Sequence, residues 1–73
     1  MSDSSPLNNN EYNILKALGI ESEFLHDAIE TYKRDAQNDN RNDLVQLWDK
    51  IKSDKQNHVS MLKDALKQMY KQS

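Results

Sequence analysis

The sequence predicts an all-α protein, either a helical hairpin or a three-helix bundle, and three observations support this. Over residues 44–70, apolar side chains recur at alternating spacings of four and three, which is the period of one face of a helix. One glycine, one proline and a charged fraction of 30% are typical of helical chains and not of sheet proteins. Turn-forming and capping residues divide the chain into a short, a medium and a long helix.

The first helix is expected over residues 9–18. Residues 1–6 should form a disordered tail, and residues 7–73 a single helical domain. Asn8 is placed to cap this helix, and Glu11 three residues later completes a pattern similar to a capping box. Gly19 is favoured as the end of the helix, in the left-handed conformation. The alternative is that Gly19 only kinks a continuous helix, since an interior glycine costs about 1 kcal/mol.

The second helix is expected over residues 22–37, with Ser22 as its N-cap. Its apolar positions repeat at helical spacing up to a cluster of turn-forming residues at 38–43, where the chain should reverse. The third helix follows over residues 42–71 and should pack antiparallel to the second, because the connection is short. At about 1.5 Å per residue, it is about as long as the first two helices together, so the first helix can cover its far end.

The long third helix carries the stripe that should organise the fold. Lys55 and His58 fall at the middle of this stripe, where the repeat calls for apolar side chains. We interpret them as polar insertions that weaken the seam in exchange for fixing its register or its partner. Trp48 should anchor the hairpin opposite residues 32–36. The apolar positions of the stripe are Leu44, Trp48, Ile51, Leu62, Ala65 and Met69.

Composition and charge narrow the possible functions. The chain has no cysteine, which excludes disulfides and thiolate metal sites and fits a reducing compartment, so a cytoplasmic location is expected. No apolar run approaches the ~20 residues that span a bilayer, and residues 1–10 lack the features of a signal peptide. The net charge of −2 divides into −5 over residues 1–43 and +3 over residues 44–73. This asymmetry favours complementary packing of the two halves over a nucleic-acid surface.

Residues 25–66 resemble one half of a ferritin-like or rubrerythrin-like bundle. Residues 25–32 are similar to the Glu-x-x-Ala-x-x-x-Tyr segment of these families, and residues 55–62 to their Glu-x-x-His region. The resemblance implies a helical hairpin that builds half of a four-helix bundle. Leu25 and Lys55 stand at the two carboxylate positions, and neither side chain can replace a carboxylate around a di-iron centre. The resemblance therefore implies the scaffold without a functional di-metal site, and no cofactor is expected.

A metal site with altered ligands is the alternative. Asp54 precedes His58 by about one helical turn, and Glu23, His26 and Glu30 on the partner helix approach the same level. A lone histidine in a helix is more often a hydrogen-bonded structural residue than a ligand. No set of nucleophile, base and orienting group and no phosphate-binding loop stands in the sequence, so no enzyme activity is expected. The candidate metal ligands are His58, Asp54, Glu30 and His26.

These patterns favour a non-catalytic protein–protein interaction or assembly module, most simply a homodimer whose two hairpins make a four-helix bundle. Apolar residues beside the main stripe give the long helix more than one hydrophobic face. A closed monomeric three-helix bundle with a smaller patch for another protein is the rival in this class. Weak nucleic-acid binding through the lysines of the basic last helix is a further alternative. The expected interaction residues are Leu44, Trp48, Ile51, Lys55, His58, Leu62 and Met69.

Overall fold

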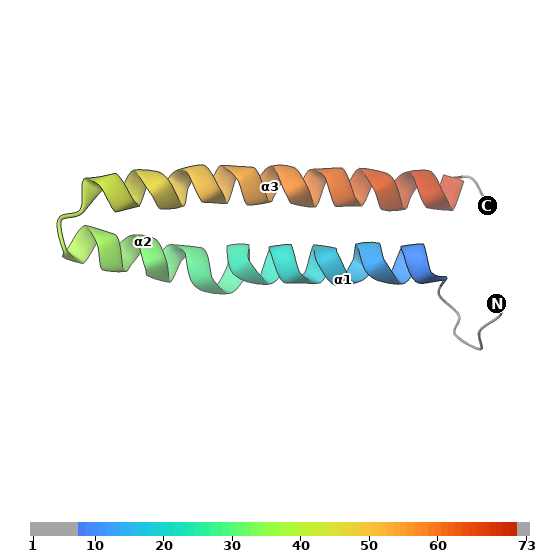
Figure 1. Cartoon of the computed structure of the whole chain (residues 1–73), viewed down its shortest axis with the longest axis horizontal. Helices are drawn as coiled ribbons and strands as arrows, with labels where there is room; N and C mark the ends of the chain where they lie inside the picture. The colour runs from blue at the N-terminus through green and yellow to red at the C-terminus, as the bar shows by residue number, and fades with distance from the viewer. Residues whose placement is uncertain (1–7, 72–73) are drawn as a thin grey trace.

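Two long helical arms lie side by side and antiparallel in the computed structural model, which describes residues 8–71 (Figure 1). The first arm consists of α1 (Asn9–Glu23), the π-helical turn η1 (Phe24–Ala28) and α2 (Ile29–Asn38) in unbroken succession. The second arm is α3 (Asn42–Lys71). The all-α prediction is confirmed in its helical-hairpin form. The hairpin measures 54 × 21 × 14 Å, with a turn end between α2 and α3 and an open end where α1 begins and α3 finishes.

The start of α1 confirms the predicted cap. The side-chain Oδ1 of Asn8 accepts a hydrogen bond of 2.7 Å from the backbone N–H of Glu11, which satisfies one of the free donors in the first turn. The tail predicted at residues 1–6 lies outside the described residues. Within residues 8–71, none of the helices combines the length and the hydropathy that crossing a bilayer requires.

The predicted helix break at Gly19 is wrong. Helix α1 continues through Gly19, whose φ is not positive, and Ser22 lies inside the same helix instead of capping a new one. The separate helices expected over residues 9–18 and 22–37, and with them the three-helix bundle, are replaced by one continuous arm. The physical reason is the relative size of two free-energy terms, the cost of an interior glycine and the gain from packing. An interior glycine costs only about 1 kcal/mol, and the residues on both sides of Gly19 gain more by packing along α3.

A single π turn interrupts the first arm. The backbone N–H of Ile29 donates to the carbonyl of Phe24, five residues earlier, and the φ of Ala28 is −109°. Such a turn absorbs one extra residue into a helix. Leu25 inside this turn is half-buried and Ile29 directly after it is buried, so both residues lie on the packed side of the arm.

The reversal between the arms follows the prediction for residues 38–43. Asn40 takes the left-handed conformation, with φ of 57°, which asparagine tolerates better than most residues. The N–H of Arg41 donates to the carbonyl of Ala36 at 2.9 Å, and the N–H of Asn40 to that of Gln37 at 3.0 Å. These two bonds are the Schellman arrangement, which ends α2 and lets α3 begin at Asn42, as expected.

The core between the arms is thin. Among the described residues, only Ile29 and Ala36 are buried, with exposed fractions of 0% and 4%. Aromatic rings extend this core toward the turn end, because Tyr32 packs against Phe24 at 5.8 Å and against Trp48 at 5.0 Å between ring centroids. The predicted position of Trp48 opposite residues 32–36 is thus confirmed. A hairpin of this kind buries one side of each helix only.

The predicted stripe of α3 is correct at most positions and wrong at His58 and Ala65. His58 and Ala65, which were predicted on the seam, are exposed, whereas Val59 and Leu66 are half-buried. The step after Lys55 is therefore four residues and not three. An α-helix has 3.6 residues per turn, so the positions that face a straight partner helix must follow a mixture of three-residue and four-residue spacings. The half-buried seam of α3 includes Leu44, Trp48, Ile51, Lys55, Val59, Leu62, Leu66 and Met69.

Candidate functional site: a polar cluster beside an apolar groove

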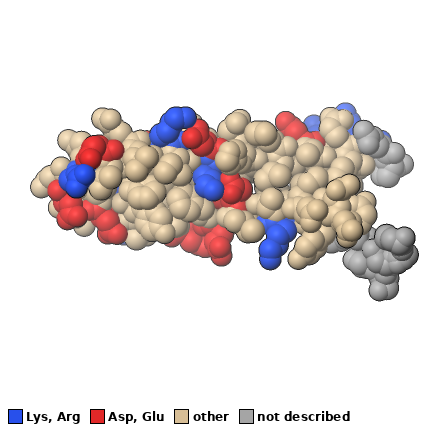
Figure 2. Space-filling view, viewed as in Figure 1, with Lys and Arg blue, Asp and Glu red and all other residues tan. Residues whose placement is uncertain are grey.

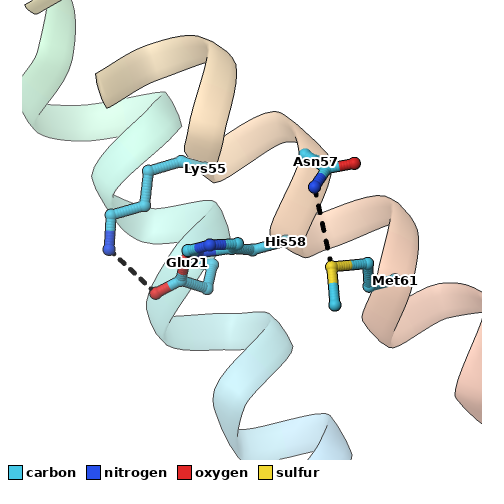
Figure 3. A network of polar contacts seen from close by, with 5 residues as sticks. All are labelled: Glu21, Lys55, Asn57, His58 and Met61. Atoms are coloured by element: carbon cyan, nitrogen blue, oxygen red, sulfur yellow. Dashed lines mark hydrogen bonds and ion pairs between the residues drawn. The ribbon is translucent and has the colours of Figure 1, made fainter. Parts of the chain in front are cut away.

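Glu21 of α1 is the centre of a polar cluster that joins the two arms (Figure 3). Its Oε2 accepts a hydrogen bond of 3.0 Å from Nζ of Lys55, and its Oε1 lies 2.7 Å from Nδ1 of His58. Only 17% of the Glu21 side chain is exposed, compared with 28% for Lys55 and 51% for His58. Each carboxylate oxygen of Glu21 therefore has its own partner on α3.

The electrostatics of this cluster favour the charged form of Glu21. The hydrogen bond from His58 lowers the pKa of Glu21 below its ordinary value, the hydrogen bond from Lys55 adds to the effect, and partial desolvation opposes it. Since an ionised carboxylate can only accept, the Nδ1 of His58 that faces it carries the proton. The Lys55 ammonium also lies 5.4 Å from the centre of the Phe24 ring, within the range of a cation–π contact. The cluster therefore has a structural role: the Glu21 carboxylate forms an ion pair with Lys55, and both of its oxygens are hydrogen-bonded.

The interpretation of Lys55 and His58 as unpaired seam residues is corrected by this geometry. Lys55 does lie on the seam, but His58 lies at its edge, and both share Glu21 as partner. The sequence did not identify Glu21 as a site residue, because a helix end at Gly19 would place Glu21 in the linker between two helices. The signal was present in the spacing: Ile14, Leu18, Glu21 and Leu25 follow the four-three repeat if the helix is continuous.

An apolar groove runs between the arms next to this cluster. It is a shallow hollow of about 500 Å³ that is widely open to solvent. Two of its lining side chains protrude into solvent: Ile20 of α1 is 54% exposed and Met61 of α3 is 60% exposed. The Sδ of Met61 accepts a hydrogen bond of 3.6 Å from Nδ2 of Asn57 (Figure 3). The lining residues are Ala17, Ile20, Glu21, His58, Met61, Leu62 and Ala65.

The structure does not bring the four candidate metal ligands together. His58 is paired with Glu21, Asp54 accepts from Lys50 at 2.9 Å, and Glu30 accepts from Lys52 at 3.0 Å. His26 lies exposed on the π turn. Within residues 8–71, no group of three or more histidine, aspartate and glutamate side chains is arranged to hold a metal ion. The carboxylates of Asp54 and Glu30 form ion pairs with lysines instead.

Two further ion pairs connect the arms nearer the turn. Lys52 of α3 contacts Glu30 at 3.0 Å, and Lys33 of α2 contacts Asp49 at 2.8 Å. The first pair, like that of Lys55 with Glu21, joins the acidic first half of the chain to its basic second half. Part of the predicted charge asymmetry is thus used inside the hairpin. Because the carboxylate of each pair is more than half exposed, such pairs contribute little stability and mainly fix the register of the arms.

The predicted interaction residues are mostly used within the hairpin itself. Leu44, Trp48, Ile51, Leu62 and Met69 are half-buried against the first arm. The apolar surface that remains for a partner lies elsewhere. The large apolar side chains with an exposed fraction above a third are Tyr12, Leu15, Ile20, Tyr32, Leu47, Met61 and Tyr70, of which Tyr32 also packs inside the hairpin on Phe24 and Trp48.

Comparisons of the chain with protein-family models, with curated proteins and with solved structures find no match. They neither support nor contradict the resemblance to ferritin-like and rubrerythrin-like hairpins, which stays an expectation from the sequence.

Proposed function

We propose that this protein is a non-catalytic interaction module that assembles by packing against a second copy of itself. The observation that carries the proposal is the imbalance between buried and exposed apolar side chains. Only two side chains are buried among the described residues, whereas seven large apolar ones are exposed. A hairpin of two helices offers one seam, so its outward apolar side chains need a partner to leave water.

The size of the core supports the same proposal. Chains of this length rarely obtain more than ~3–5 kcal/mol from a single core, and they commonly gain the rest by oligomerisation. Cysteine is absent from the sequence, so disulfides do not supply the missing stability. Two hairpins that share a core make a four-helix bundle, in which each helix buries two sides instead of one. A reducing compartment such as the cytoplasm suits a cysteine-free module of this kind.

Sedimentation equilibrium of the full chain over a wide range of concentrations tests this proposal. We expect a mass of twice the chain at tens of micromolar, with dissociation on dilution. A chain that stays monomeric across this range would contradict the proposal. Far-UV circular dichroism of the same samples should show the helical content of the hairpin, so that a monomer is not mistaken for an unfolded chain.

A further inference from the structure

We propose that the second copy docks on the groove face, which we define by Ala17, Ile20, Met61 and Ala65, in an antiparallel order about a two-fold axis. In this arrangement the Met61 side chain of each copy enters the groove of the other. The inference rests on the proposed self-association and names the surface that carries it.

The groove face is self-complementary, which a two-fold interface requires. A two-fold axis brings the same patch of both copies together, so one patch must supply both the protruding side chains and the hollow that receives them. Met61 and Ile20 protrude from opposite walls of the groove, on α3 and α1. The hollow of about 500 Å³ lies directly between them.

Charge distinguishes this face from two other hollows of the hairpin. At the end of α3, a hollow beside Tyr70 is lined by three lysines, Lys63, Lys67 and Lys71, and one carboxylate, that of Asp64, so its net positive charge would face like charge in a second copy. Near the turn, the hollow beside Trp48 is lined by two carboxylates, those of Asp35 and Asp39. On the face that Figure 2 shows, the charged atoms gather mainly over the turn half and the middle of the hairpin, and a smaller group lies along one edge of the open half.

The carboxylate at the groove is already paired. Glu21 and His58 are the ionisable residues of its lining, and both oxygens of the Glu21 carboxylate have partners, His58 and Lys55. A charge that is paired and hydrogen-bonded costs far less to remove from water than an isolated one. The groove face can therefore be covered without leaving a carboxylate unsatisfied.

The antiparallel order follows from the position of the groove along the hairpin. The acidic side chains of Asp35 and Asp39 lie together near the turn, at one end of the molecule. An antiparallel order sends the two turns to opposite ends of the dimer and keeps these charges apart. With the axis near Met61, the open end of the partner reaches only ~15 Å toward the turn at 1.5 Å per residue. Leu47, ~21 Å from Met61 on the same helix, stays outside the contact.

Single cysteines test this geometry, because the native sequence has none. Under mild oxidation, the Met61→Cys variant should form a disulfide-linked dimer, since the axis brings the two copies of this position together. The Leu47→Cys variant is the matched control, also on α3 and also exposed. It should stay uncrosslinked. A crosslink at Leu47 would overturn the antiparallel order, and its absence at Met61 in a dimeric protein would overturn the choice of face.

A charge at the same two positions gives an independent measurement. The Met61→Glu variant should dimerise at least about tenfold more weakly in sedimentation, because its carboxylate would enter the apolar groove. The Leu47→Glu variant should keep the affinity of the wild type. If Leu47→Glu breaks the dimer and Met61→Glu does not, the face is wrong while the proposed function stands. If the wild type is monomeric, the proposed function itself fails.

Discussion

The contact between Trp48 and Tyr32 holds the turn half of the hairpin together, with ring centroids 5.0 Å apart. Replacing Trp48 with alanine should lower the free energy of unfolding by up to about 3 kcal/mol, because the indole is half-buried and its loss leaves a gap in a thin core. Urea unfolding followed by circular dichroism measures this change. Leu47→Ala is the control, since Leu47 is 46% exposed and adjacent in sequence. It should change stability by less than about 0.5 kcal/mol. Equal losses in both variants would contradict the proposed role of Trp48.

The Glu21 carboxylate should make part of the stability depend on pH. Its pKa is lowered in the folded chain, mainly by His58 and then by Lys55. Its stabilising contribution is therefore complete above the ordinary pKa of 4.5 and is lost as the pH falls through the lower folded value. We expect the wild type to lose more stability on acidification than the Glu21→Gln variant, at equal protein concentration.

Urea unfolding at several pH values below neutrality measures this difference. The pKa values of Glu30 and Asp43 are also lowered, by Lys52 and Arg41 respectively, but these pairs remain in both proteins and so cancel. Parallel losses of stability in wild type and variant would show that the cluster around Glu21 contributes nothing.

Among the helical elements, α1 contains the one glycine of the chain. Apart from its two chain neighbours and the backbone of its own helix, an added Cβ at Gly19 would meet no atom within 4 Å, and the φ of this residue is not positive. Gly19→Ala should therefore raise stability by up to about 1 kcal/mol, because alanine costs less backbone entropy in a helix. The thermal midpoint by circular dichroism reports the sign, with the exposed Ser53→Ala on α3 as a control for helix propensity alone. A loss of stability would instead support a left-handed helix end at Gly19.

The π turn in the first arm predicts an unusual tolerance to deletion. Removing the exposed Asp27 should convert η1 into an ordinary α-helical turn, because such a turn carries one residue more than the helix needs. Leu25 and Ile29 would then be three apart, a spacing that also keeps two residues on one face. We expect the helical content and the cooperative thermal transition to remain.

Deletion of Ser53 from the regular helix α3 is the matched control. It would rotate everything after it by about 100° relative to the seam and expose Leu62 and Met69. This variant should lose most of its cooperative transition. If both deletions were equally harmful, the π turn would not be a site of spare length.

At the scale of the whole molecule, the proposed dimer links folding to concentration. A partner that binds only the folded chain stabilises it by mass action, so the thermal midpoint should rise as the protein concentration rises. Circular dichroism melting over a hundredfold range of concentration measures this effect. The Met61→Glu variant should show a weaker dependence than the wild type. A midpoint that is independent of concentration in the wild type would contradict assembly.

Local sequence signals determined much of the architecture. The cap at Asn8, the reversal at residues 38–43 and the full extent of α3 each depend on a few neighbouring residues, and the structure agrees with all three. The place of Trp48 opposite Tyr32 follows from the short connection, since residues equally far from a tight turn must face each other.

Tertiary structure decided the rest, because at those positions the local preferences were weak or conflicting. At Gly19 a cost of about 1 kcal/mol competes with packing along the whole first arm, and packing prevails. The π turn, and the replacement of His58 and Ala65 by Val59 and Leu66 on the seam of α3, depend on how two helices fit, which neither helix encodes alone. Glu21 became the partner of Lys55 and His58 only once the first arm was continuous, so the sequence revealed two members of the cluster and the fold supplied the third.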